Sequence, residues 1–154
     1  MDEGSFFSVS RDTYPPSHVY TRPPGFPHWM ASYRISGCSL TTVEGKSARF
    51  SPGWVFFTRP AIVYRTEAGG RQETITAIWA HFDPQAEWLP LIQSLPAHPM
   101  GHGYGLCLRH TGFDPQVAAT FEELAAWNRD RQPHAKVFSM NALERILLLA
   151  VAAH

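Results

Sequence analysis

Prolines and glycines divide this chain into two unlike parts. They crowd the first two-thirds of the sequence, whereas the last twenty residues contain neither. Short apolar or alternating runs, separated by such residues at spacings near ten, are typical of a β-sandwich or a β-barrel. The uninterrupted stretch that follows predicts helix. We therefore expect a mainly β fold with helices at its C-terminal end.

The expected strands follow one another between residues 28 and 82. Glu44-Gly45 is a tight hairpin-turn signal between two of them, and Ala68-Gly69-Gly70 is interpreted as a hairpin loop. No internal repeat is visible, so a solenoid is not expected. The strands are placed at His28–Ile35, Leu40–Val43, Ser47–Phe50, Trp54–Phe57, Ala61–Tyr64 and Glu73–Phe82.

Two helices are expected in the last third of the chain. Asp114-Pro115 combines an N-cap residue with a proline at the first helical position, and apolar residues from Val117 onward share one helical face. Arg129–Pro133 is a polar connection. The second helix should run from about Pro133 to the end.

The second of these helices carries a 4-3-4-3 spacing, which is typical of a coiled-coil seam. A neighbouring apolar stripe would pack on the β-part and leave the seam to a partner helix. The polar Asn141 favours an interface, because one buried polar group can fix register and oligomeric state. A single wide apolar face buried within the monomer is the alternative. The seam consists of Val137, Asn141, Glu144, Leu148 and Val151.

Length and charge narrow the classes of function. The chain has 154 residues, which fit one domain. Thirteen basic residues balance thirteen acidic ones, which argues against a free-standing nucleic-acid binder. The longest strictly apolar run, Ile146–Ala153, is too short to span a bilayer, and the first residues do not resemble a secretory signal. Cys38 and Cys107 are expected to be reduced thiols. We expect a cytoplasmic protein that does not bind membranes.

No motif for covalent catalysis stands out. The sequence has no His-x-His pair of the kind used in β-barrel metal sites, no Gly-x-Ser-x-Gly elbow and no glycine-rich phosphate loop. His98 and His102 could hold a metal, but no cysteine or acidic residue lies close to them in the sequence. We therefore expect no enzyme, no metal and no cofactor.

Aromatic side chains offer a different kind of site. A barrel interior lined with Trp, Tyr, Arg and hydroxyl groups suits a sugar, because the apolar face of a pyranose stacks on indole while its hydroxyls bond to fixed polar groups. Ordinary aromatic core packing is the simpler explanation for any single tryptophan. The tryptophans within or beside the β-part are Trp29, Trp54, Trp79 and Trp88.

A series of short motifs, in this order and at this spacing, resembles the sensor domain of the AraC family of bacterial transcription activators. The likeness is to its arabinose-responsive branch from about Ser8 to Phe82, and Thr111–Phe113 and Asn141–Leu149 resemble the helical pair of the family. The motifs are Arg22–Gly25, Tyr33–Gly37, Gly45, Phe50–Gly53, Pro60 and Trp79–Phe82.

The resemblance implies a cupin-type (jelly-roll) β-barrel followed by a two-helix dimerisation segment. Residues 1–21 would form the N-terminal arm and first strands, residues 22–105 the barrel, and residues 113–154 the helical segment of one sensor domain. It also implies a small effector, usually a sugar, inside the barrel and a homodimer through the last helix. A helix-turn-helix domain outside these 154 residues would bind DNA, so DNA and RNA polymerase would be partners of the full-length regulator only. A small cupin enzyme, such as a sugar isomerase or a metal-dependent oxygenase, is the alternative.

The resemblance also suggests which residues bind the effector. Arg22 falls where the family places an arginine on sugar hydroxyls, Trp79 where it places the stacking indole, and Ser8 on a hydroxyl position. Phe26 and Met30 fall on apolar positions that line the pocket.

Two other pocket positions depart from the family pattern. Thr66 and Ala77 replace a tyrosine and a histidine, while His81 lies on the same face of its strand as Trp79 and could supply a compensating donor. These replacements favour a sugar other than arabinose or a different small molecule. In the last helix, Val137, Asn141 and Leu148 fall on dimer-contact positions of the family.

Overall fold

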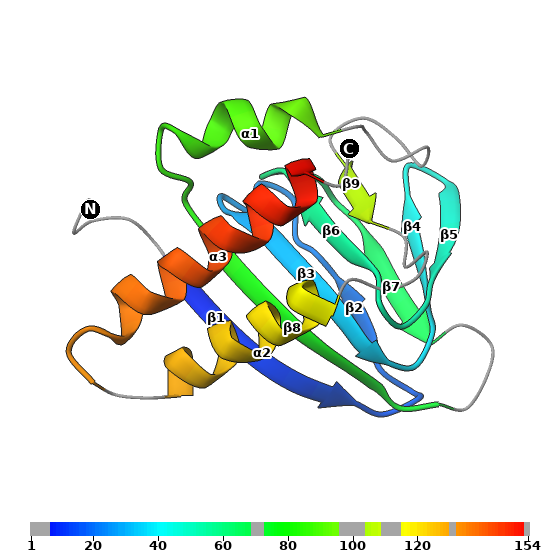
Figure 1. Cartoon of the computed structure of the whole chain (residues 1–154). Coiled ribbons are helices and arrows are strands. Elements are labelled where there is room, and N and C mark those ends of the chain that lie inside the picture. Colours follow the sequence, from blue (N-terminus) through cyan, green and yellow to red (C-terminus); the bar gives the residue numbers. More distant parts are fainter. Residues whose placement is uncertain (1–6, 69–72, 96–103, 109–114, 130–131, 153–154) are drawn as a thin grey trace.

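Two antiparallel sheets face each other and enclose the interior of a barrel (Figure 1). The structure, a computed structural model, describes residues 7–68, 73–95, 104–108, 115–129 and 132–152. In these residues one sheet has the strand order β1-β8-β3-β6-β9 and the other the order β2-β7-β4-β5. The strands are β1 (Phe7–Tyr14), β2 (Val19–Thr21), β3 (Trp29–Ser36), β4 (Ser39–Val43), β5 (Lys46–Phe50), β6 (Val55–Thr58), β7 (Arg65–Ala68), β8 (Ile75–Phe82) and β9 (Tyr104–Leu108).

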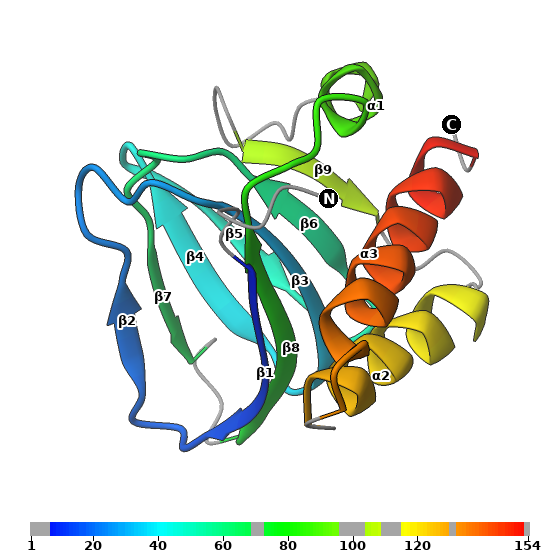
Figure 2. The same cartoon turned by 90° about the vertical axis from the view of Figure 1, so that its left-hand side faces the viewer.

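Three helices accompany the barrel: α1 (Trp88–Ser94), α2 (Pro115–Arg129) and α3 (Ala135–Ala152). α2 and α3 pack together on the outer face of the five-stranded sheet (Figure 2). Phe121 of α2 is completely buried, and its ring stacks on Tyr33 of β3 with 5.2 Å between the ring centroids. This architecture is mainly β with C-terminal helices, as expected from the sequence. In the described part of the chain, no helix is long and apolar enough to cross a bilayer.

Alternation along the strands divides the interior into two cores. Ile78, Ala80 and Phe82 of β8 belong to the core that the five-stranded sheet shares with the helices. Trp79, which points to the opposite face because side chains alternate with a period of two, packs on the core inside the barrel. That inner core is built from Met30, Val43, Phe50, Phe56 and Tyr64.

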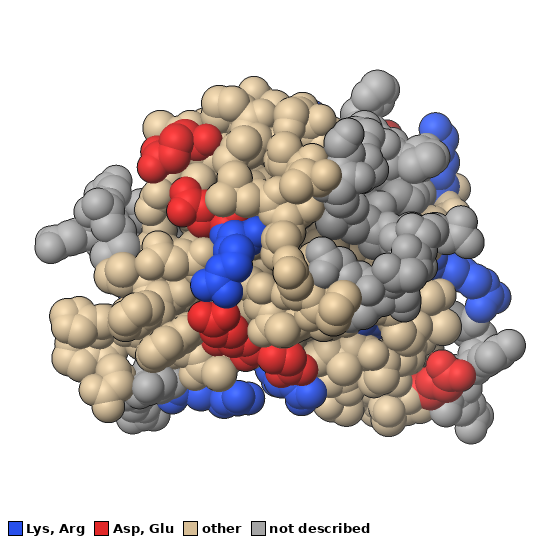
Figure 3. All heavy atoms as spheres, in the orientation of Figure 1, with Lys and Arg blue, Asp and Glu red and all other residues tan. Residues whose placement is uncertain are grey.

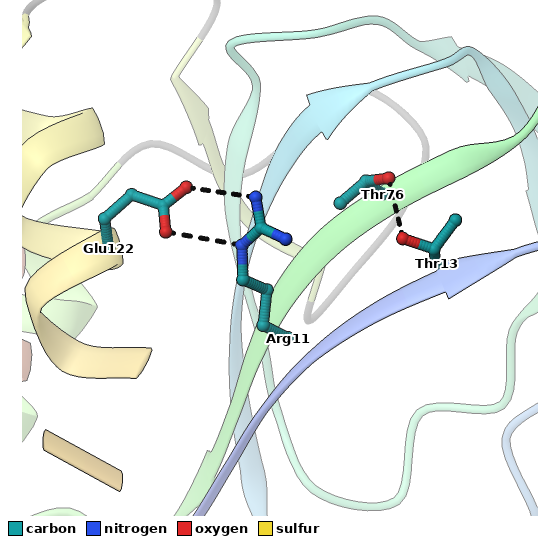
Figure 4. A network of polar contacts seen from close by, with 4 residues as sticks. All are labelled: Arg11, Thr13, Thr76 and Glu122. Carbon is teal, nitrogen blue, oxygen red and sulfur yellow. Dashed lines mark hydrogen bonds and ion pairs between the residues drawn. The ribbon is translucent and has the colours of Figure 1, made fainter. Parts of the chain in front are cut away.

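β1 is an edge strand of the larger sheet and also contacts α2. It pairs with β8 from Phe7 to Tyr14. The Arg11 guanidinium meets the carboxylate of Glu122 on α2 at 3.3 Å, and the hydroxyls of Thr13 and Thr76 lie 3.0 Å apart across the β1–β8 pair (Figure 4). The first strand is therefore part of the sheet.

The hairpin prediction around Glu44-Gly45 is confirmed. β4 and β5 pair from Ser39 to Phe50, and the two turn residues have φ values of 50° and 78°. Positive φ at both central residues is the mark of a type I′ turn, whose twist matches that of the strands it joins. The helix predicted from Pro115 also begins there, whereas the last helix begins at Ala135.

The strand predicted at Ala61–Tyr64 is wrong. Ala61 has a φ of 65°, which an extended strand does not allow, and the pairing strand β7 begins only at Arg65. The residue pattern also missed β1, β2, β7, α1 and β9, although the family resemblance placed first strands within residues 1–21. Asp114, Gly69 and Gly70 lie outside the described residues.

Candidate ligand-binding site

A cavity of about 170 Å³ opens between the two sheets. β1, β3 and β8 contribute to it from one sheet, and β2 and β7 from the other. Its lining residues are Ser10, Tyr14, His18, Tyr20, Arg34, Tyr64, Thr66, Glu67, Ile75, Trp79 and His81.

Aromatic rings form much of the cavity wall. Tyr14 stacks on His18 with 4.3 Å between ring centroids, and its edge meets Trp79 at 6.3 Å. Tyr20 and Tyr64 lie against each other at 5.9 Å. Such walls suit a small ring-shaped molecule with an apolar face.

Trp79 brings an unsatisfied donor to this wall. Its indole Nε1 is buried and meets no acceptor with hydrogen-bond geometry among the described residues. It does lie near the Tyr14 hydroxyl, where it opposes the rise in the pKa of that phenol that burial causes. A buried donor without an acceptor costs about 1–3 kcal/mol. A ligand oxygen at this place would remove that cost.

The ionisable lining groups that burial affects most are neutral near pH 7. Burial, followed by the Asp12 carboxylate, raises the pKa of Tyr14 to about 12, and burial also raises the pKa of Tyr64. Burial, followed by the positive charge of Arg22, lowers the pKa of His81 to about 4. The two phenols and the imidazole therefore present hydrogen-bonding groups without charge.

Arg22 does not line the cavity. It is fully buried, and its guanidinium donates to the carbonyl oxygens of Arg59 and His28, both at 2.5 Å, and of Ile62 at 3.4 Å. It also lies over the Phe26 ring, 4.5 Å from its centroid. These contacts join the segments before β3 and before β7, so Arg22 braces this part of the barrel.

The structure brings only some of the predicted ligand residues to the cavity. Thr66, Trp79 and His81 line it. Met30 lies in the inner core, where its sulfur accepts a hydrogen bond from the Tyr64 hydroxyl at 3.3 Å. Phe26 packs against His81, 5.2 Å between ring centroids.

Two further predicted positions lie beside the lining residues. Ala77 is fully buried on β8, opposite Arg34. Ser8 is exposed and pairs with His81, whereas Ser10, two residues further along β1, pairs with Trp79 and lines the cavity.

Arg34 is the most consequential residue that the sequence interpretation missed. It lines the cavity and is 1 % exposed. Because side chains alternate along a strand, the sequence places Arg34 on the opposite face of β3 from Trp29, Ala31 and Tyr33, but it does not say which face lines the cavity. His98, His102 and the side chain of Cys107 lie outside the described residues. Among the described residues, no group of three His, Cys, Asp or Glu could hold a metal ion.

The predicted helix seam lies largely on the outer face of α3. Val137 is 40 % exposed and Leu148 is 49 % exposed, and Asn141 between them is also exposed. Val151 is half-buried. Glu144 instead turns toward α1, where its Oε1 accepts a hydrogen bond from Trp88 Nε1 at 2.9 Å.

No protein-family model and no curated protein sequence matches this chain. Among solved structures, it is similar to ToxT from Vibrio cholerae strain SCE256, crystallised with a bound unsaturated fatty acid, at 9 % identity and a TM-score of 0.59. That match covers 97 % of this chain and 53 % of ToxT, so the chain spans about half the length of that protein.

Smaller parts of the chain are similar to cupin domains. The Cnp3 cupin domain of Schizosaccharomyces pombe matches 56 % of this chain and 62 % of its own at 19 % identity, with a TM-score of 0.47. A cupin domain of an XRE family transcriptional regulator from Enterobacter cloacae matches 51 % of this chain and 83 % of its own at 11 % identity, with a TM-score of 0.45. The two-sheet topology and the likeness to ToxT over 97 % of this chain show the fold that the sequence predicts: a cupin-type β-barrel followed by helices.

Proposed function

We propose that this chain is the ligand-sensing and dimerisation domain of a transcription regulator of the AraC type. The observation that carries the proposal is Trp79, whose ring lines a cavity inside the barrel and whose buried N–H lacks an acceptor there. A domain that holds an unfilled donor in an aromatic cavity is suited to bind a small molecule. The proposal assigns no covalent chemistry to these residues.

A sugar is the proposed class of ligand. Its apolar ring face would stack on Trp79, and its hydroxyls would bond to Tyr14, Thr66 and His81, whose side chains lie around the same cavity. Tyr14 and His81 are uncharged near pH 7, so they exchange hydrogen bonds with neutral hydroxyls without the cost of burying a further charge. The likeness to ToxT supports binding of a small molecule by this fold, because that protein was crystallised with a bound unsaturated fatty acid.

A second copy of the chain is the proposed partner of α3. Val137 and Leu148 expose apolar surface there, with Asn141 between them. The face drawn in Figure 3 carries acidic and basic side chains interspersed among uncharged ones. Because neither sign of charge dominates there, electrostatic repulsion would not keep an identical copy away.

β8 provides a route from the cavity to the helices. Trp79 points into the barrel, while Ile78 and Ala80 on either side of it pack in the core shared with α2 and α3. A ligand that favours one position of Trp79 would thus favour one packing of the helices, which is a population shift. DNA and RNA polymerase would respond through a helix-turn-helix domain outside these 154 residues.

A thermal-shift screen against pentoses and hexoses tests the proposal. A ligand at a hundredfold excess over its Kd stabilises by about 2.7 kcal/mol, which for this size of domain raises Tm by about 5–10 °C. Trp79→Ala should abolish the shift. Trp29→Ala is the matched control, because Trp29 is half-buried and packs in the core on the helix side of the sheet. A shift that survives Trp79→Ala would refute the cavity as the site.

A further inference from the structure

The barrel contains two buried guanidinium groups, and one of them lines the ligand cavity. Arg22 is 0 % and Arg34 is 1 % exposed. Among the described residues these are the charged side chains that are buried, and no described carboxylate is buried with them. Positive charge inside a protein favours anionic partners, because Coulomb interactions are stronger there than in water.

The two arginines differ in whether their guanidinium groups can reach a ligand in the cavity. Arg22 directs its N–H groups at three backbone carbonyls and braces the barrel. Arg34 extends from β3 to the cavity wall. A guanidinium has five N–H donors in a planar fork, so Arg34 is able to keep contacts within the protein and still offer donors to a ligand.

The backbone holds Arg34 firmly in place. Its N–H donates to the Trp54 carbonyl at 3.0 Å, and its own carbonyl accepts from Gly53 N–H at 2.8 Å. Its β8 partner is Ala77, two residues before Trp79 on the same face of the sheet. Diagonal neighbours of this kind lie about 7–8 Å apart. One small molecule can therefore reach the guanidinium and the indole together.

One acidic side chain, Glu67, is among the described residues that line the cavity. Glu67 is a lining residue, but its carboxylate lies 3.4 Å from the Arg65 guanidinium and its side chain is 35 % exposed, so solvent and Arg65 both screen it. Asp12 is not a lining residue, but it pairs with Ala77 from β1 as Arg34 does from β3, so it shares that row of the sheet; its carboxylate accepts a hydrogen bond from Tyr14 at 3.2 Å and is partly exposed. His81 is neutral near pH 7. The buried charge facing the cavity is that of Arg34.

We infer that the ligand of this cavity is an organic acid whose carboxylate pairs with Arg34 while its ring stacks on Trp79. The inference rests on the proposed function, since it takes the cavity to be the effector site. Within the proposed class of sugars it specifies a sugar acid. A guanidinium matches a carboxylate through two parallel N–H···O bonds, which a neutral sugar cannot form with the same strength.

Matched pairs of compounds test this inference on the full chain. D-glucuronate is compared with D-glucose, D-galacturonate with D-galactose, and benzoate serves as an acid with a ring but no sugar hydroxyls. Calorimetric titration should give each sugar acid at least tenfold higher affinity than its neutral partner. Arg34→Gln should weaken the acid about 10- to 100-fold, since hydrogen bonds to charged groups are of that strength, and should remove the preference. Arg49→Gln, exposed on β5, is the control.

A third variant keeps the test decisive if Arg34→Gln does not fold. Arg34→Lys keeps the positive charge at this place but not the planar fork of donors. It should keep the preference for the acids over the neutral sugars and bind the acids more weakly than the unmodified chain does, because two parallel N–H···O bonds can no longer form; unchanged acid affinity would overturn the pairing with Arg34.

The outcomes separate this inference from the proposed function. If neutral sugars bind as well as their acids, or if Arg34→Gln leaves acid binding unchanged, the inference is overturned and the sugar sensor stands. If benzoate binds through Arg34 but no sugar or sugar acid does, the carboxylate site stands and the sugar assignment falls. If none of these compounds binds, both are overturned.

Discussion

Replacing Glu144 by alanine should destabilise the fold without separating the proposed dimer. Trp88 is 1 % exposed, and its indole N–H donates to Glu144 Oε1 at 2.9 Å. Glu144→Ala leaves that buried donor without its acceptor, which costs about 2 kcal/mol. For a domain of this size the Tm should fall by about 4–8 °C. Glu144→Gln keeps an acceptor oxygen at the same place and should lose less than half as much.

Two measurements on the same samples test this reasoning. Thermal unfolding followed by circular dichroism gives the stability, and sedimentation equilibrium gives the oligomeric state at the same protein concentration. We expect both Glu144 variants to sediment as the unmodified chain does, because this side chain is turned toward α1. A Glu144→Ala protein that dissociates while its Tm is unchanged would refute the inward position of Glu144. A Gln variant as unstable as the Ala variant would refute the role of the acceptor.

Three further predictions concern separate parts of the molecule. Leu148→Glu should dissociate the proposed dimer in sedimentation experiments and barely change monomer stability, since Leu148 is 49 % exposed; an unchanged dimer would place the interface elsewhere. The pKa of His81 is lowered to about 4 in the fold, so the unfolded chain takes up a proton first: the stability that this group contributes is complete above about pH 6.5 and is lost as the pH falls toward 4. Urea unfolding across this range should show a flatter profile for His81→Gln, and an identical profile would contradict it. Gly37→Ala should destabilise strongly in the same assay, because Gly37 has a φ of 78° and a Cβ there would lie 2.2 Å from the Thr74 carbonyl oxygen; a variant of normal stability would contradict that geometry.

The elements that the sequence predicted well are those with local signals. The β4–β5 hairpin depends on two adjacent residues, Glu44 and Gly45, whose φ values suit a type I′ turn. α2 starts at a proline that is suited to the first helical position. The long α3 contains no helix breaker. None of these requires knowledge of a distant partner.

The missed elements depend on distant partners or are short. β7 has the sequence RTEA and β2 has VYT, so neither shows the apolar alternation of a half-buried strand. β2 is formed by pairing with β7, and β7 by pairing with β2 and β4. The error at Ala61–Tyr64 has the opposite cause. That run is apolar because Tyr64 fills the inner core, but its backbone turns at Ala61.

The site was predicted in part for a similar reason. Trp79 and His81 share a face of one strand, which the sequence reveals at once. Choosing between Arg22 and Arg34 required knowing which face of β3 the helices cover, and that follows only from the packing of α2 and α3. Arg22 is occupied by carbonyls from segments that lie up to 40 residues away in the sequence.

The place of β1 at the edge of its sheet has a kinetic consequence. In the described part of the chain this strand pairs along one side only, with β8, and its ion pair with α2 is exposed, so its amide protons should exchange with solvent more readily than those of the inner strands β8, β3 and β6. It nevertheless supplies Ser10 and Tyr14 to the cavity. A molecule bound in the cavity would therefore hold this edge strand in place. Its binding should be measurable as slower hydrogen exchange of the amides of residues 7–14.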